Sequence, residues 1–156
     1  MAIDLFASNL SFDEIKAFLE NHKKLNITVR RAPHHSPQSK APAAVADKYV
    51  ASLAFNPIGG AWREISAAEA LKILTSMLSV SMAYNISLLG STLAKQVATR
   101  LISQFQSDST HYLTNTQLQT QGNALSWTPV TESTFDSAVV IYNREYIGII
   151  CIEDED

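Results

Sequence analysis

The stretch SAVVIYNREYIGIICIED, residues 137–154, consists of two apolar runs separated by a short polar segment. Both runs are rich in Val, Ile and Tyr, which are the residue types that strands favour. Asn143 and Arg144 stand where a tight hairpin turn would lie, and Asn tolerates the positive φ that such a turn requires. Arg suits that conformation less well, so a four-residue turn fits equally. We therefore expect a C-terminal β-hairpin, and we expect its sheet to organise the fold.

The N-terminal third adds two strands and a helix to this sheet. Residues 2–8 and 26–31 are short apolar or β-branched runs, which predict strands. Between them, Ser11 and Glu14 have the spacing of a capping box, and the following apolar residues recur at helical spacing. A helix over 11–24 is the expected connection.

A polar segment follows, and then another candidate strand. Residues 32–44 hold three prolines without periodicity, which predicts a mobile loop. Residues 48–55 alternate large and small side chains, so we interpret them as a strand that could pair with 26–31. The glycines of 56–60 indicate a turn, for which Trp62 is a plausible core anchor.

The remaining segments complete an α+β fold. Residues 67–83 and 86–105 carry leucines at steps of three and four, which predicts two buried helices separated near Asn85. Residues 111–116 and 125–131 are short strand candidates. The whole chain, 1–156, is expected to be one domain, a mainly antiparallel sheet with about three helices packed against it.

Composition excludes several classes of protein. The chain has 156 residues, of which 46% are hydrophobic and 17% charged, so it can bury a core. Its longest apolar candidate, 67–89, is interrupted by Lys72 and by polar residues, so no membrane span is expected. The first residues include Asp4 and have no basic segment, unlike a signal peptide. With Cys151 as the single cysteine, no internal disulfide can form, and a reducing cytoplasmic location is expected.

The charge is distributed unevenly along the chain. Residues 1–105 hold eleven Lys or Arg against seven Asp or Glu, whereas residues 106–156 hold one against eight. Such asymmetry is typical of proteins with a charged partner. It is also what a fold that pairs the two parts internally would show.

No catalytic or metal-binding motif is apparent. Cys151 lies in an apolar strand, where a buried thiol is expected. His34 and His35 are adjacent, and that spacing suits neither a metal pair on a helix nor a rigid general base. We therefore expect no metal and no cofactor. A small enzyme whose site combines His34, His35 or His111 with a distant acid remains the alternative.

Residues 30–40 form a basic stretch that could contact an anion. Arg30, Arg31 and Lys40 accompany the two histidines there. The pI of about 5.8 and the lack of interleaved aromatic residues argue against nucleic acid as the partner.

The acidic C-terminal part is the best candidate for a binding surface. Its last four residues are all acidic, and no linker separates them from the predicted strand, so at least Glu153 should be held by the fold. Acids beside aromatic residues suit a basic protein partner, because charge steers the encounter and aromatics supply contact energy. The candidate partner-binding residues are Trp127, Asp136, Tyr142, Glu145, Tyr146, Glu153, Asp154, Glu155 and Asp156.

The stretches WTPVTESTFDSAVV, 127–140, and REYIGIICIEDED, 144–156, give the chain a general resemblance to bacterial immunity proteins. Those proteins neutralise polymorphic or contact-dependent-inhibition toxins, often basic nucleases. The resemblance implies a non-enzymatic inhibitor that binds a cognate toxin and blocks its active site or an adjacent exosite. A self-associating module that pairs its terminal strand with a second copy is a further alternative, although the four terminal acids argue against it.

Overall fold

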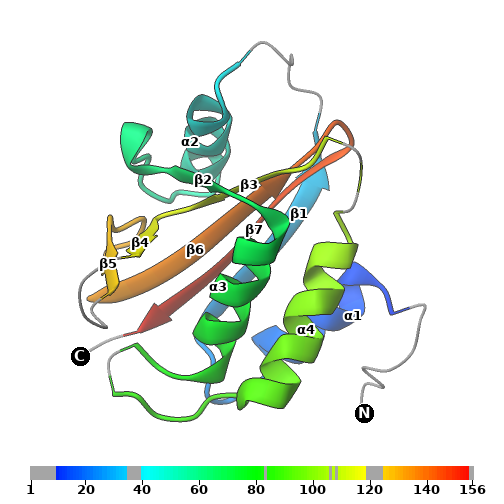
Figure 1. The fold of residues 1–156 in the computed structure, drawn as a ribbon, viewed down its shortest axis with the longest axis vertical. Coiled ribbons are helices and arrows are strands. Elements are labelled where there is room, and N and C mark those ends of the chain that lie inside the picture. The colour runs from blue at the N-terminus through cyan, green and yellow to red at the C-terminus, as the bar shows by residue number, and fades with distance from the viewer. Residues whose placement is uncertain are drawn as a thin grey trace.

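A computed structural model describes residues 10–34, 40–82, 84–105, 107, 109–118 and 125–154. Its centre is a five-stranded antiparallel sheet in the order β1-β7-β6-β3-β2 (Figure 1). The strands are β1 (Ile27–Pro33), β2 (Arg63–Ile65), β3 (His111–Thr114), β6 (Phe135–Tyr142) and β7 (Tyr146–Asp154). Two shorter strands, β4 (Thr116–Leu118) and β5 (Leu125–Trp127), pair separately. The predicted α+β class with a C-terminal hairpin is confirmed.

The hairpin between β6 and β7 forms the middle of this sheet. Tyr142 pairs with Ile147, and the four residues 143–146 make the turn. The Asn143 side-chain oxygen accepts hydrogen bonds from the backbone N–H groups of Glu145, at 2.8 Å, and Tyr146, at 2.9 Å. No turn residue has a positive φ. Of the two predicted turns the four-residue one is correct, and Asn143 acts through its hydrogen bonds instead of its tolerance for unusual φ.

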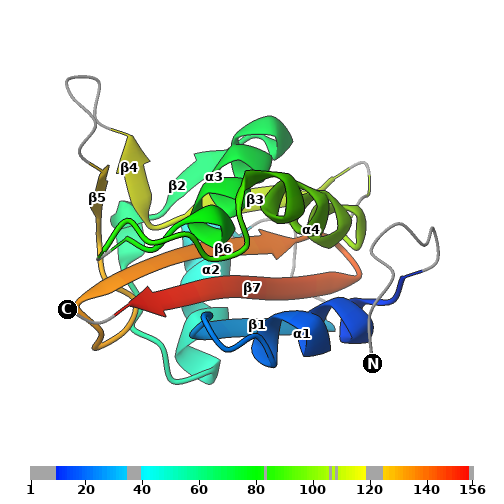
Figure 2. The same cartoon turned by 90° about the horizontal axis from the view of Figure 1, so that it is seen from below.

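Helices cover both faces of the sheet, giving three layers. The helices α1 (Phe12–Glu20), α3 (Ala67–Ser79) and α4 (Ser91–Ser103) lie on one face, and α2 (Pro42–Ser52) lies on the other (Figures 1 and 2). Successive residues of β7 enter different layers: Ile150 and Ile152 pack with α1, α3 and α4, whereas Ile149 and Cys151 pack with α2. The continuous apolar run of β7 follows from this arrangement, because neither of its faces meets water.

The prediction of a strand at 48–55 was wrong, because most of that segment belongs to α2. The helix starts at Pro42, a residue that suits the first turn of a helix, and continues through an Ala-rich stretch. Val45, Tyr49 and Leu53 are four apart and pack together against the sheet. The alternation of large and small residues in 48–55 is compatible with this helical face as well as with a strand, so the alternation alone could not distinguish the two. The partner of β1 is β7.

Other predicted boundaries shift by a few residues. The predicted strand 2–8 lies outside the described residues, as does the middle of the predicted loop 32–44, whose ends instead belong to β1 and α2. The predicted helix 67–83 ends earlier than expected, at Ser79, and the predicted helix 86–105 begins later, at Ser91. Residues 80–82 and 84–90 belong to the loop between α3 and α4. Asn85 and Gly90 have φ of 53° and 80° there, which a helix cannot accommodate.

None of the helices in the described part of the chain has the length and apolar character needed to cross a membrane.

Candidate functional site

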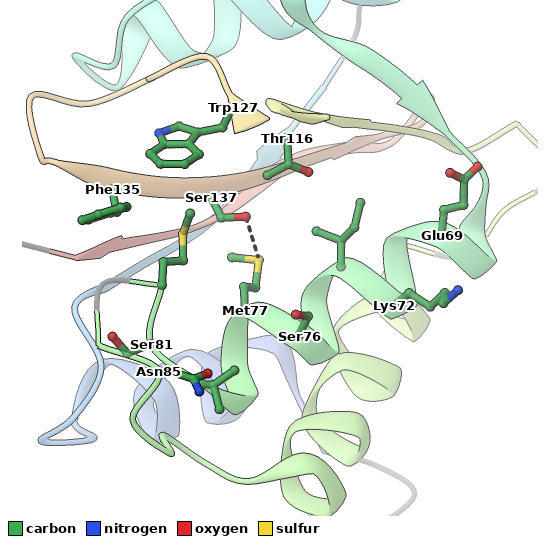
Figure 3. A pocket seen from close by; sticks show the side chains of 13 residues that line it. Glu69, Lys72, Ser76, Met77, Ser81, Asn85, Thr116, Trp127, Phe135 and Ser137 are labelled. Atoms are coloured by element: carbon green, nitrogen blue, oxygen red, sulfur yellow. Dashed lines mark hydrogen bonds between the residues drawn. The ribbon is translucent and has the colours of Figure 1, made fainter. Parts of the chain in front are cut away.

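A cavity of about 690 Å³ opens between α3, the loop that follows it, the first residues of β6 and the β4–β5 pair (Figure 3). This volume is within the range of sites that hold a small molecule or a protruding side chain. Its walls come from segments far apart in sequence, so the cavity is a product of the tertiary fold.

Aromatic and sulfur-containing side chains make one part of the cavity apolar. The Trp127 and Phe135 rings lie 5.4 Å apart between centroids, tilted by 34°. Across from them, the Met77 sulfur lies 3.9 Å from the Ser137 hydroxyl, and Met82 also lines the space. Methionine adapts to differently shaped partners, and the aromatic pair offers a rigid surface beside it.

The other part of the cavity is charged. Glu69 and Lys72 of α3 line it, and Arg63 of β2 forms an ion pair with Glu69 at 3.2 Å. The pKa of Glu69 is lowered, chiefly by the hydrogen bond from the Ser66 backbone N–H at the helix start and then by Arg63. The carboxylate is therefore ionised, and the cavity runs from a charged side to an apolar side (Figure 3).

Exposed apolar side chains stand beside the cavity, on the loop between α3 and α4. Val80, Tyr84 and Ile86 are 37%, 56% and 55% exposed, an unusual grouping for large apolar residues. The loop is held in place by backbone hydrogen bonds, including Ser81 N–H to the Ile86 carbonyl at 2.8 Å. These side chains are thus presented on an ordered segment.

Asp154, at the end of β7, adjoins this loop. The Ser81 hydroxyl donates to the Asp154 carboxylate, which ties the loop to the strand. Asp154 is paired in the sheet with Phe135 of the cavity wall. Glu153 lies on the opposite face of β7, the face of Cys151, and accepts from the Ser133 hydroxyl at 2.8 Å. We refer to the surface beside the cavity as the pocket rim, and its members are Val80, Tyr84, Ile86, Trp127, Phe135 and Asp154.

Asp136, one of the candidate partner-binding residues, is fully buried. Its carboxylate accepts hydrogen bonds from the Asn115 amide at 2.7 Å, from the Thr131 N–H and hydroxyl at 3.0 and 2.8 Å, and from the Val130 N–H. A carboxylate held this way fixes the backbone around it, and it is not accessible to a partner protein.

Tyr142, also expected at the binding surface, is buried between two histidines. The His111 ring stacks on it with 4.7 Å between centroids, and the His34 ring meets it edge-on at 5.5 Å. Burial, and next the charge of Glu64, raise the pKa of Tyr142. This phenol therefore belongs to the interior.

Glu145 and Tyr146 lie at the far end of β7 from the pocket rim. A strand rises about 3.3 Å per residue, so the nine residues of β7 separate them from Asp154 by roughly 26 Å. Tyr146 also carries the Arg31 guanidinium 4.4 Å above its ring. Glu155 and Asp156 lie outside the described residues. Of the predicted set, the structure brings together Trp127 and Asp154, whereas Glu153 lies on the opposite face of β7.

The histidines that the enzyme alternative required do approach one another. His111 Nδ1 lies 2.7 Å from the Glu64 carboxylate, and Tyr142 separates this pair from His34. His34 lines a groove beside α2, but His111 does not. His35 is outside the described residues, and among those described no three His, Cys, Asp or Glu side chains are grouped as metal ligands.

The three exposed apolar residues of the loop, Val80, Tyr84 and Ile86, were not predicted from the sequence as part of a binding surface. Val80 was assigned to a helix continuing to residue 83 and Ile86 to the next helix, where both would have been buried. The available signal was the cluster of Ser, Asn and Gly residues between 79 and 91, which is typical of a loop.

Comparison with known proteins identifies no matching family model, no matching curated protein and no matching solved structure.

Proposed function

We propose that this chain is an immunity-type inhibitor, which binds a cognate bacterial toxin with a basic surface, such as a nuclease, through the pocket rim. The supporting observation is the contact between Ser81 and Asp154, which sets exposed apolar side chains next to a fixed carboxylate at one end of the sheet. The toxin would be met in the cytoplasm, and inhibition would be stoichiometric instead of catalytic.

The two kinds of side chain on the pocket rim would contribute differently. Asp154 would attract Lys or Arg of the toxin and raise the association rate, an effect that salt screens. Tyr84, Ile86 and the cavity with Trp127 would provide the desolvated contact that holds the complex together. Because the loop is already hydrogen-bonded, little ordering accompanies binding, and this favours tight association.

The proposal is tested by co-expressing the tagged chain with each neighbouring gene of its genome and measuring which proteins co-purify with it, and in what ratio. We expect one-to-one co-purification with a basic protein whose toxicity the chain suppresses. If none of these gene products co-purifies or is neutralised, the proposal is wrong.

Matched variants then locate the surface. The variant Asp154→Asn should slow association several-fold and flatten its salt dependence, while Tyr84→Ala should speed dissociation about tenfold. Glu145→Gln, at the other end of β7, is the charge-matched control and should leave both rates unchanged. Equal effects of Glu145→Gln and Asp154→Asn would show that the pocket rim is not the interface.

A further inference from the structure

A second hollow, of about 500 Å³, lies between α2 and β1, on the sheet face opposite the one that α3 covers. Arg30 from β1, His34 just after it, Lys40 just before α2 and Lys48 within α2 all line it. No carboxylate is among its described lining residues. Four basic side chains from three segments thus converge on one concave surface, which the linear sequence shows only in part.

Tyr49 also lines this groove, and its hydroxyl is buried without a hydrogen-bond partner among the residues that the structure describes. Burial raises the pKa of Tyr49 to about 12, an effect that the nearby Arg30 charge opposes. The phenol is therefore protonated at neutral pH and is a donor for which the described residues offer no acceptor. Buried donors of this kind are rare in native proteins, and a bound ligand with an acceptor oxygen would satisfy this one.

The polar groups of the groove are almost all hydrogen-bond donors. Arg, Lys and the Tyr49 O–H donate, whereas the Ser52 hydroxyl already donates to the Tyr49 carbonyl at 2.6 Å. Arg30 uses one nitrogen of its guanidinium on Glu20, at 3.2 Å, and the group has further N–H donors. A ligand that complements this surface must be rich in acceptors and negatively charged.

The rest of the lining is apolar and limits the size of the ligand. Val45, Leu53 and Ile147 line the groove together with the Tyr49 side chain. A volume of 500 Å³ fits a small molecule that has an organic body as well as an anionic group. A phosphate offers several acceptor oxygens and up to two charges, which suits convergent Arg and Lys better than a single carboxylate does.

We propose that the groove between α2 and β1 binds a phosphate-bearing small molecule of mononucleotide size, whose phosphates contact Arg30, Lys40 and Lys48 and accept a hydrogen bond from Tyr49. The neighbouring Arg31 has a different role: its guanidinium lies over the rings of Phe12 and Tyr146 on the other face of the sheet. The inference is independent of the toxin-binding proposal, because the groove shares no residue with the pocket rim.

The test is calorimetric titration of the full chain with ATP, with inorganic pyrophosphate and with adenosine, at low and at physiological salt. We expect ATP to bind one-to-one. Arg30→Gln with Lys48→Gln should weaken binding at least tenfold, and Tyr49→Phe should weaken it several-fold. Lys95→Gln, an exposed lysine of α4 far from the groove, is the control and should bind ATP as the unmodified chain does. Circular dichroism checks that each variant is folded.

The outcomes separate the sources of binding. Pyrophosphate binding as tight as ATP would mean that the phosphates alone are recognised, whereas tighter ATP binding would mean that the apolar lining also contributes; both support the proposal. Absence of ATP and pyrophosphate binding would overturn it, as would equal weakening by Lys95→Gln. Binding only to long nucleic acid strands would also overturn it, because a bounded groove would not then be the site.

Discussion

Asp136 illustrates how a residue chosen for its charge can turn out to be structural. It sits inside the fold, with its carboxylate surrounded by the donors of Asn115, Val130 and Thr131. Asn115 in turn accepts a hydrogen bond from the Ala138 N–H at 2.8 Å and donates to the Thr128 carbonyl at 2.9 Å. The two side chains together fix the chain that leads from β5 into β6.

We predict that Asp136→Ala lowers the free energy of unfolding by about 3 kcal/mol, because it leaves several buried hydrogen-bond donors without the acceptor that the carboxylate provided. Glu145→Ala, which removes an exposed carboxylate, should change it by less than about 0.5 kcal/mol. Urea titration followed by circular dichroism measures both. Similar values for the two variants would contradict the structural role of Asp136.

Cys151 gives a second prediction, this time about pH. The thiol is fully buried in β7; burial, followed by the charges of Asp136 and Glu153, raises its pKa. An unfolded thiol ionises near pH 8.5, whereas the folded one stays protonated. As the pH rises, the thiol therefore ionises first in the unfolded state, and this ionisation stabilises the unfolded state. The contribution of Cys151 to the free energy of unfolding is complete below about pH 8.5 and is lost as the pH rises above that value.

The loss should amount to about 1.4 kcal/mol per pH unit from this thiol. Cys151→Ala removes that contribution, so its unfolding free energy should fall less steeply between about pH 9 and pH 10 than that of the unmodified chain. Tyrosines with raised pKa values affect both proteins and cancel in the difference. Parallel curves for the two proteins would refute the prediction.

At the scale of elements, Asp47 connects α2 to the segment that follows it. Its carboxylate accepts from the Ile58 N–H at 2.8 Å, the Gly59 N–H at 2.9 Å and the Trp62 indole N–H at 2.7 Å. Trp62 is buried in the α2 layer, as its predicted role of anchor requires. One side chain on the helix thus fixes the turn and the tryptophan together.

Asp47→Ala should cost about 2 kcal/mol of unfolding free energy, because three donors lose a charged acceptor. It should also shift the emission of Trp62 to longer wavelength as water gains access to the indole; a Trp127→Phe background makes Trp62 the single reporter. Asp47→Asn keeps one acceptor oxygen and should have an intermediate effect. An unchanged spectrum in the alanine variant would mean that Asp47 does not anchor the turn.

The elements that sequence could predict are those with a local signal. The predicted capping box of Ser11 with Glu14 forms in the structure at the start of α1, and Ser66 with Glu69, which have the same spacing, form a second one at the start of α3. The hairpin of β6 and β7 was evident because each strand is a long apolar run. The helix α2 was not predicted because residues 48–55, which include its last five residues and the segment that follows, alternate like a strand. Only the packing of this segment against Ile149 and Cys151 in the sheet distinguishes a helix from a strand here.

The candidate site was less predictable than the fold, because it depends on distance in space. Sequence identified Asp154 and Trp127, but it grouped them with Glu145 and Tyr146, which the length of β7 places elsewhere, and with Glu153, which lies on the opposite face of the strand. It could not relate Tyr84 to Asp154, since only the folded loop brings them to the same surface. The basic stretch 30–40 was predicted to be able to contact an anion, but Lys48 and Tyr49 could not be assigned to the same groove until 48–52 was known to be helical.

At the scale of the whole molecule, the sheet is shared by both helical layers, and this predicts one cooperative transition. Trp62 reports the α2 layer, and Trp127 reports the cavity on the other side. Urea midpoints measured with Trp62→Phe and Trp127→Phe, each leaving one reporter, should agree with the midpoint from circular dichroism of the same variant. Separate midpoints within one variant would show that a layer unfolds by itself.

The pairing of β1 with β7 has a consequence for the chain as it is being made. Ile27 of β1 pairs with Ile152, so β1 emerges from the ribosome long before the strand that it needs. During that interval its backbone hydrogen-bonding groups are open to any other strand, a known route to aggregation. Arg30 and Arg31 stand in the middle of β1, and two positive charges there repel a second copy of the same segment. The basic character of this strand therefore protects the nascent chain as well as serving the finished protein.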